Sequence, residues 1–299
     1  MASLKEVRGR IVSVSSTQQI TKAMKMVAAA KLRRAQDNIL RMRPYAQRLG
    51  SILTNLSRLT DDDSISNVYA EKRDINRVLI ILVTSDRGLC GAFNSNVLKA
   101  VNRLVSEKYS SQMAAGNVSF MAIGRKGHDA LVRRGSKLVG NYTNVFSNLS
   151  FDTVREAAER AMNGFRSGEF DQVEIIYNEF KNVATQIIRT EQFLPVEQNA
   201  QDVAEDNAAA TLDYIFEPSK EQIVEELIPK SLKIQVYKAV LESNASEHGA
   251  RMTAMDKATD NAGELLKELK LTYNRTRQAA ITKEILEIVG GAEALASSR

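Results

Sequence analysis

The residue types best suited to chemistry lie together in residues 86–91 (DRGLCG), which hold an acid, a base, the only cysteine and two glycines. The preceding run, residues 77–85 (RVLIILVTS), is typical of a buried parallel strand. The loop after such a strand is the usual ligand corner of an open α/β sheet, and glycines there let backbone N–H groups approach an anion. Because the segment matches neither GxGxxG nor a Walker A loop, a tight turn is favoured over a phosphate site.

Cys90, His128 and His248 offer few other routes to catalysis. A nucleophilic cysteine needs a neighbouring base, and nothing in the sequence places either histidine beside Cys90. So few cysteines and histidines also argue against a metal site built from them. A single cysteine excludes an internal disulfide and favours a reducing compartment. We therefore predict no catalytic residue, no cofactor and no metal, and expect His248 to pack on a helix interface.

The middle of the chain alternates strands and helices, which predicts a small open α/β domain of the Rossmann type. We expect strands at 77–85, 118–123, 172–180, 185–194 and 212–216, and helices at 94–108, 125–134 and 151–166. Asp152 is the expected N-cap of the last helix. The strands 172–180 and 185–194 should form a hairpin, since only a short segment separates them. The polar segments 60–67 and 198–210 are expected to be a linker and a loop.

An apolar heptad repeat runs through residues 3–58. Thirteen of the sixteen seam positions counted from Leu4 are apolar, and the register never slips. Such a repeat requires a partner helix in a left-handed coiled coil, and at about 1.5 Å per residue the helix would be roughly 80 Å long. The repeat continues past Pro44, so we expect a bend there, not an end. Gln18, Thr21 and Lys25 interrupt the seam together, which suggests that this stretch also faces a partner.

Residues 221–295 predict a second long helix, with an apolar stripe from Leu241 to Tyr273. The α/β segment begins where the first helix ends and finishes where the second begins, so the two helices should pair antiparallel. Counting both helices leaves about twenty residues of the second one unpaired, roughly 30 Å of helix. Apolar residues cover more than one face of this overhang, so we expect it to sit inside another protein. The predicted domains are residues 1–59 (coiled-coil helix), 60–219 (α/β domain) and 220–299 (coiled-coil helix with an unpaired apolar tip).

Charge is concentrated at the start of the chain. The first fifty residues hold eleven Lys or Arg and two Asp or Glu, a net charge of +9 against +5 for the whole chain. The first helix should therefore face an acidic partner, either nucleic acid or a protein surface. A nucleic-acid-binding or scaffolding coiled coil is one alternative, although Tyr45 is the only aromatic residue among these bases. An α/β enzyme with helical dimerisation arms is another, although it would lack a nucleophile–base pair.

Four segments of the chain resemble motifs of one family: residues 21–29 (TKAMKMVAA), 84–94 (TSDRGLCGAFN), 246–262 (SEHGARMTAMDKATDNA) and 281–292 (ITKEILEIVGGA). In this order they resemble the γ subunit of F-type ATP synthases along nearly the full length of the chain. The single cysteine departs from the dithiol switch of the chloroplast subunit, and residues 195–212 leave no room for its regulatory insert. The start MASLKEV shows no transit peptide, so the chain resembles a bacterial subunit.

This resemblance implies a non-catalytic rotor shaft inside a ring of three α and three β subunits. The α/β domain would bind the ε subunit and the membrane c ring, whose proton-driven rotation turns the shaft. The subunit would be peripheral, at the cytoplasmic face of the bacterial inner membrane, reaching the membrane only through the c ring, and would bind no nucleic acid. The implied contacts with the α/β ring are Met24, Lys25, Arg277, Gln278, Thr282, Glu284, Ile285 and Ile288. The basic flank facing an acidic β loop would be Lys22, Lys31, Arg33 and Arg34.

Overall fold

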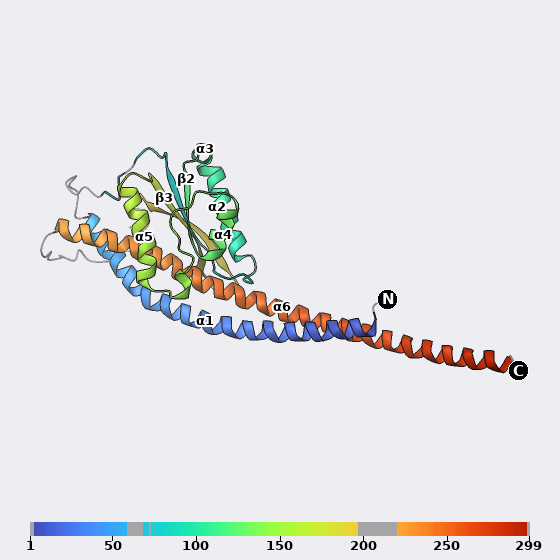
Figure 1. The fold of residues 1–299 in the computed structure, drawn as a ribbon. Helices are drawn as coiled ribbons and strands as arrows, with labels where there is room; N and C mark the ends of the chain where they lie inside the picture. Colours follow the sequence, from blue (N-terminus) through green and yellow to red (C-terminus); the bar gives the residue numbers. More distant parts are fainter. Residues whose placement is uncertain (1–2, 59–67, 72, 197–219, 298–299) are drawn as a thin grey trace. The chain divides into compact units, whose positions relative to one another are not determined.

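The structure, a computed structural model, describes residues 3–58, 68–71, 73–196 and 220–297. Two long helices, α1 (Leu4–Arg58) and α6 (Lys220–Ser297), enclose the α/β elements in the sequence, as predicted (Figure 1). Helix α1 continues through Pro44, which confirms that the proline does not end it. The expected linker at 60–67, loop at 198–210 and strand at 212–216 lie outside the described residues.

The contacts group the chain into two compact units. One, here called the helix-pair unit, consists of Met1–Ala28 and Met252–Arg299; the other, the sheet unit, is Ala29–Arg251. Both long helices run without a break from one unit into the other, so each unit contains part of α1 and part of α6.

The sheet unit contains four strands in the order β2-β1-β3-β4. They are β1 (Val78–Val83), β2 (Val118–Ile123), β3 (Gln172–Phe180) and β4 (Gln186–Leu194). Strand β1 pairs in parallel with β2 and β3, and β3 and β4 form an antiparallel hairpin. The predicted parallel strand and the predicted hairpin are therefore both confirmed. The central position of β1 explains its unbroken apolar sequence, because all six of its residues are buried.

The helices of the sheet unit follow the predicted alternation. They are α2 (Phe93–Lys108), α3 (Ser110–Ala114), α4 (Arg125–Arg133) and α5 (Phe151–Arg166), with a short 3₁₀ helix at Val145–Ser147. Helix α3 and the 3₁₀ helix were not predicted, because such short segments carry no apolar period of their own.

The prediction of Asp152 as the N-cap of α5 was wrong. The N-cap is Ser150, whose extended backbone aims its hydroxyl at the N–H of Thr153, 3.3 Å away. The Thr153 hydroxyl in turn accepts the N–H of Ser150, which completes a capping box. Asp152 lies in the first turn instead, where its negative charge interacts favourably with the positive N-terminal end of the helix dipole.

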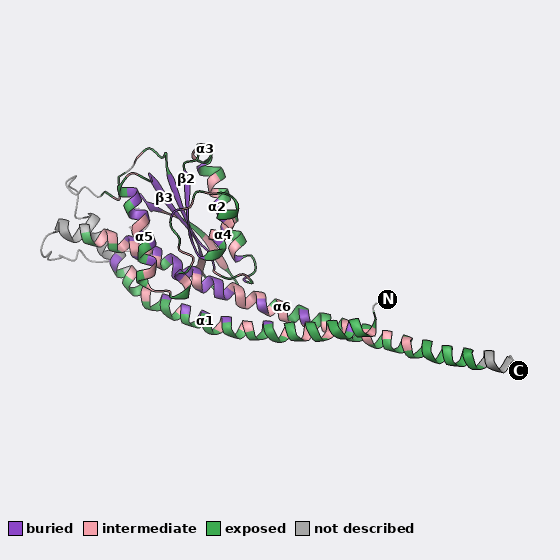
Figure 2. Ribbon diagram, in the orientation of Figure 1, coloured by how far each residue is buried: buried purple, intermediate pink, exposed green. Residues whose placement is uncertain are grey.

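Helix α6 forms part of the core of the sheet unit. Alternate residues of β1 face opposite sides: Leu79, Ile81 and Val83 pack with α5 and α6, while Val78, Ile80 and Leu82 pack with α2 and α4. The α6 residues in the first cluster are Leu232, Val236, Ala239 and Val240. All four are buried, so this segment of α6 cannot leave the sheet without exposing apolar surface (Figure 2).

In the helix-pair unit α1 and α6 are antiparallel partners, because Gln18 contacts Thr259 and Lys25 contacts Asp256. This confirms the predicted pairing. Every described seam position of α1, from Leu4 to Leu49, is buried or half-buried. Beyond the paired region, all residues of α6 from 281 to 292 are exposed, as predicted for the overhang (Figure 2).

Candidate functional site

The three polar residues in the α1 seam form a polar layer with α6. The Gln18 amide donates to the Thr259 carbonyl (3.4 Å), and Lys25 pairs with Asp256 (2.5 Å). The hydroxyl oxygens of Thr21 and Thr259 lie 2.8 Å apart, and each also reaches a carbonyl of its own helix. One hydroxyl therefore donates to the other, which donates to its own helix. This layer fixes the register of the pair, since a shift by one turn would leave buried polar groups without partners.

The Lys25–Asp256 pair also remains open to the outside. The Lys25 side chain is 38% exposed and that of Asp256 is 47% exposed. Thr21, in contrast, is buried between the helices. Of the three seam residues, Lys25 is thus the one whose charge a partner could reach while the helices stay paired.

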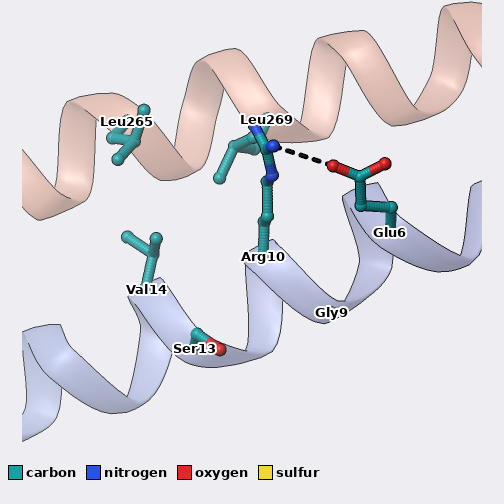
Figure 3. Close-up of a pocket in the computed structure, with 7 residues that line it drawn as sticks. All are labelled: Glu6, Gly9, Arg10, Ser13, Val14, Leu265 and Leu269. Atoms are coloured by element: carbon teal, nitrogen blue, oxygen red, sulfur yellow. Dashed lines mark hydrogen bonds and ion pairs between the residues drawn. The ribbon is translucent and has the colours of Figure 1, made fainter. Parts of the chain in front are cut away.

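A shallow hollow of about 410 Å³ lies beside the helix pair nearer the N-terminus of α1. Figure 3 shows Val14, Leu265 and Leu269 along it and Arg10 held to Glu6 by a 2.8 Å ion pair. Gly9 borders the hollow, and a Cβ at this position would meet no atom within 4 Å. The lining is mainly apolar, so the hollow suits a side chain of another protein better than a reacting substrate.

The predicted ring contacts fall into two separate patches of the helix-pair unit. Met24 and Lys25 lie half-buried on α1, whereas the remaining contacts are exposed on α6 from Arg277 to Ile288. Lys25 is paired with Asp256, so the patches are separated by about twenty residues of α6, roughly 30 Å. The structure therefore does not bring the predicted contact residues together. A partner that touches both patches must extend along the helix pair.

All four predicted flank residues, Lys22, Lys31, Arg33 and Arg34, are exposed. They do not share one face of α1. With about 3.6 residues per turn, Lys22 and Arg33 lie on the same face and Lys31 lies on the opposite one. The positive charge thus surrounds much of the helix and does not form a single stripe.

The turn at residues 86–91, whose position after a parallel strand is that of a ligand corner, is occupied by a side chain of the protein itself. Arg251 of α6 donates to the carbonyls of Arg87 (3.0 Å) and Gly88 (3.2 Å). Cys90 is buried beneath the turn, and burial raises the pKa of its thiol, which opposes the thiolate form that a nucleophile needs. These contacts support a structural turn over a phosphate or nucleophile site.

His248 packs on the buried face of α6, as expected. Burial lowers its pKa to about 4, and the nearby charges of Arg251 and Lys31 act in the same direction. Glu247 lies 4.0 Å from the imidazole, but its carboxylate is already paired with Arg251. Burial raises the pKa of Glu247, and the Arg251 charge partly opposes that rise.

The lowered pKa of His248 predicts a loss of stability in mild acid. Below the ordinary pKa of 6.5 the unfolded chain takes up a proton that the folded chain refuses until about pH 4. Between pH 7.5 and pH 5 this costs about 2 kcal/mol of unfolding free energy. Urea unfolding of the chain and of His248→Gln at both pH values isolates the effect, because Glu247 contributes with the opposite sign in both proteins. Equal pH dependence in the two proteins would contradict this assignment.

Two other kinds of site are not seen in the parts of the chain that the structure describes. Within these ranges, His, Cys, Asp and Glu side chains nowhere gather in threes as a metal site would require. Likewise, no described part of any helix is both long enough and apolar enough to cross a membrane.

Comparison with known proteins gives matches along nearly the whole chain. The sequence model of the family described as ATP synthase matches residues 3–295. The ATP synthase gamma chain of Cytophaga hutchinsonii is 65% identical over 295 residues, which are 99% of each chain. The chain belongs to the ATP synthase gamma-chain family. Other gamma chains with 99% coverage of both sequences come from Flavobacterium psychrophilum, at 56% identity, and Chlorobaculum tepidum, at 50%.

Two solved structures of ATP synthases contain chains with a similar fold. A chain of the Euglena gracilis mitochondrial ATP synthase has a TM-score of 0.64 and 23% identity, covering 98% of this chain and 94% of that one, which shows a shared fold. A chain from the central stalk and c ring of the Tetrahymena thermophila enzyme has a TM-score of 0.58 and 27% identity, covering 80% and 99%. These similarities give no support to the nucleic-acid-binding alternative.

Sequence reasoning missed one cluster of this gamma-family chain, formed by Glu247, Arg251 and the turn they hold. Both residues lie within the third recognised segment, residues 246–262, at the i,i+4 spacing of a helical ion pair. That spacing was visible in the sequence, but the turn that Arg251 binds is 163 residues away from it. No local pattern predicts such a contact.

Proposed function

We propose that this chain is the central rotor shaft of a bacterial F-type ATP synthase. It is a non-catalytic subunit that transmits rotation between the proton-driven c ring and three catalytic β sites, for synthesis or hydrolysis of ATP. The observation that carries the proposal is gamma-chain family membership over the whole described helix pair and sheet. The exposed apolar end of α6 supports it, because such a surface needs a partner around it.

The helix pair suits this function because it has no threefold symmetry. Three identical sites arranged around it meet different side chains, and a ligand shifts a conformational equilibrium only by contacts that differ between states. Beyond the paired region a single helix continues, with Ile281, Ile285 and Leu286 exposed on more than one side. Rotation of the chain would therefore present changing surfaces to each β subunit in turn.

The partners follow from the same proposal. Three α and three β subunits would surround the helix pair, and the ε subunit and c ring would bind at the sheet unit. The chain is then a peripheral part of a membrane complex, reaching the membrane through the c ring, on the cytoplasmic face of the inner membrane. Ring contacts would include Met24 and Lys25 on α1. On α6 they would include Arg277, Gln278, Thr282, Glu284, Ile285 and Ile288, which are all exposed.

Affinity capture from a native membrane extract tests this function. The tagged full-length chain should bring down an ATPase with α, β and this chain in a ratio of roughly 3:3:1, as the ring stoichiometry requires. The captured complex should hydrolyse ATP, while the chain alone should not. Capture without an α and β pair, or hydrolysis by the chain alone, would overturn the proposal.

The basic residues of α1 predict a salt-dependent contribution to ring binding. Lys22 and Arg33 are exposed on one face of α1, so Lys22→Glu with Arg33→Glu should weaken association with an α₃β₃ ring about tenfold at low salt. The loss should shrink as salt screens the charges. The matched control is Lys99→Glu with Lys137→Glu, which makes the same charge change at exposed positions outside α1. Equal weakening by both pairs would show that net charge alone matters.

A further inference from the structure

The side chain of Arg251 joins helix α6 to the first turn of the sheet. One terminal nitrogen of its guanidinium donates to the main-chain oxygens of Arg87 and Gly88, at 3.0 and 3.2 Å. The other terminal nitrogen contacts the carboxylate of Glu247, one helical turn earlier. The Arg251 side chain is only 12% exposed and that of Glu247 is 8% exposed. This is an enclosed contact and not a surface ion pair.

The turn that Arg251 holds is tied to the other helices of the sheet unit as well. The Ser85 hydroxyl donates to the Arg87 carbonyl (2.7 Å), and Asn94 of α2 accepts the N–H of Ser85 (2.9 Å). At the opposite side, Asp86 accepts the first N–H of α4, from Arg125. The turn therefore links β1, α2 and α4, and Arg251 adds α6 to this set.

The shape of the turn depends on being held. Leu89 has a φ of +65°, a left-handed conformation that leucine rarely adopts, and its side chain is 65% exposed. The side chain thus gains little from burial that would favour this backbone shape. The carbonyls of Arg87 and Gly88 point inward to the guanidinium, and without it Gly88 would lose a hydrogen bond from a charged donor.

Glu247 is placed to orient Arg251. Its carboxylate is buried on α6, where burial raises its pKa, and Arg251 is its ion-pair partner at the i+4 position. A buried carboxylate is costly unless it is paired, so Glu247 and Arg251 act as one unit. The ion pair fixes the orientation of the planar Arg251 guanidinium, whose two donating nitrogens a lysine ammonium could not reproduce.

We infer that Arg251, oriented by Glu247, is a positioning residue that locks the turn at residues 86–91 to helix α6. The lock makes the sheet and α6 move as one body at this point. Its consequence for coupling rests on the proposed function: a shaft helix that could slip against the sheet would lose torque. The lock itself is a property of the isolated chain and is tested without any partner.

Cys90 supplies the readout for the isolated chain. It is the only cysteine, it belongs to the turn and it is 2% exposed, so the rate of its reaction with a thiol reagent reports opening of the turn. Arg251→Ala should raise this rate at least tenfold at constant pH. Arg251→Lys should restore only part of the protection, and Glu247→Gln should raise the rate severalfold. Lys238→Ala, an exposed position on the same helix, is the control and should leave the rate unchanged.

Thermal unfolding of each variant separates local opening from global unfolding. If Arg251→Ala no longer folds, the comparison is made on Glu247→Gln and Arg251→Lys, which keep the size of the side chains. A rate within twofold of the parent chain in those folded variants would overturn the inference. Faster labelling of Arg251→Lys at an unchanged melting temperature would support it, because this variant keeps both charges that act on the pKa of the Cys90 thiol, and global destabilisation cannot produce that result.

The reconstituted enzyme tests the consequence. Arg251→Ala should retain ATP hydrolysis but pump severalfold fewer protons per ATP, and Arg251→Lys should recover part of the ratio. Loss of hydrolysis and pumping in equal measure would count against the consequence of the lock for coupling. If labelling changes as expected while the parent chain itself shows no coupling, the proposed function fails and the lock stands.

Discussion

Ending the chain after Ala280 is expected to weaken its association with an α₃β₃ ring at least tenfold while the sheet unit stays folded. The removed segment carries five exposed large apolar side chains: Ile281, Ile285, Leu286, Ile288 and Val289. Burying one such side chain completely contributes roughly 1.5–3 kcal/mol, so even one good contact corresponds to a tenfold change. The core clusters of the sheet unit contain none of these residues.

The matched control ends the chain after Ala292, which keeps all five apolar side chains. Ring association measured by surface-immobilised binding, and proton pumping of the reconstituted enzyme, should be near normal for this longer chain and reduced for the shorter one. Circular dichroism should show both truncated chains folded. If the chain ending at Ala280 binds and couples as well as the control, the exposed end of α6 does not hold the shaft in the ring.

Replacing Gly124 by alanine is expected to destabilise the sheet unit by about 3–5 kcal/mol, because strain and overpacking add. Gly124 has φ +105° and ψ 144°, a region that side chains exclude, and a Cβ there would lie 2.1 Å from the Thr84 carbonyl oxygen. Thr84 directly follows β1 and its N–H is bonded to the Ile123 carbonyl of β2, so its backbone cannot move without disturbing the sheet. Urea unfolding at neutral pH measures the loss.

Gly116→Ala is the control, since Gly116 also has a positive φ of +71° but a Cβ there would meet no atom within 4 Å. It should cost only about 1–2 kcal/mol, the price of the left-handed backbone alone. The difference between the two variants isolates the contact with Thr84. A similar loss in both would show that the β1–β2 packing can yield at this point.

Elements with a strong local period were predictable. The heptad of α1 and the apolar run of β1 each indicate which residues face the interior. The structure buries all of β1 and buries or half-buries the described seam positions of α1. The antiparallel pairing of α1 and α6 followed from chain order. The α/β segment begins where the first helix ends and finishes where the second helix begins, so the two helices leave it side by side. The exposed end of α6 followed from counting the unequal lengths of the two helices.

Features that depend on distant contacts were not predictable. Nothing in the sequence of α6 shows that Val236 completes the core under β1, or that Arg251 binds the turn after it. Local competition caused the error at α5, where Ser150 and Asp152 are both good N-caps and the reciprocal bond with Thr153 decided for Ser150. The sequence also did not show that Asp256 of α6 pairs with Lys25, which still leaves the Lys25 side chain 38% exposed.

Rotation under ATP tests the central claim most directly. The α₃β₃ ring is immobilised through β, and a bead is attached to the sheet unit through a cysteine introduced at exposed Ser111 in a Cys90→Ser chain. A rotor shaft predicts rotation in one direction, with pauses at each third of a turn that the threefold ring imposes. Sustained ATP hydrolysis by the assembled complex while the bead only fluctuates about a fixed angle would contradict the account.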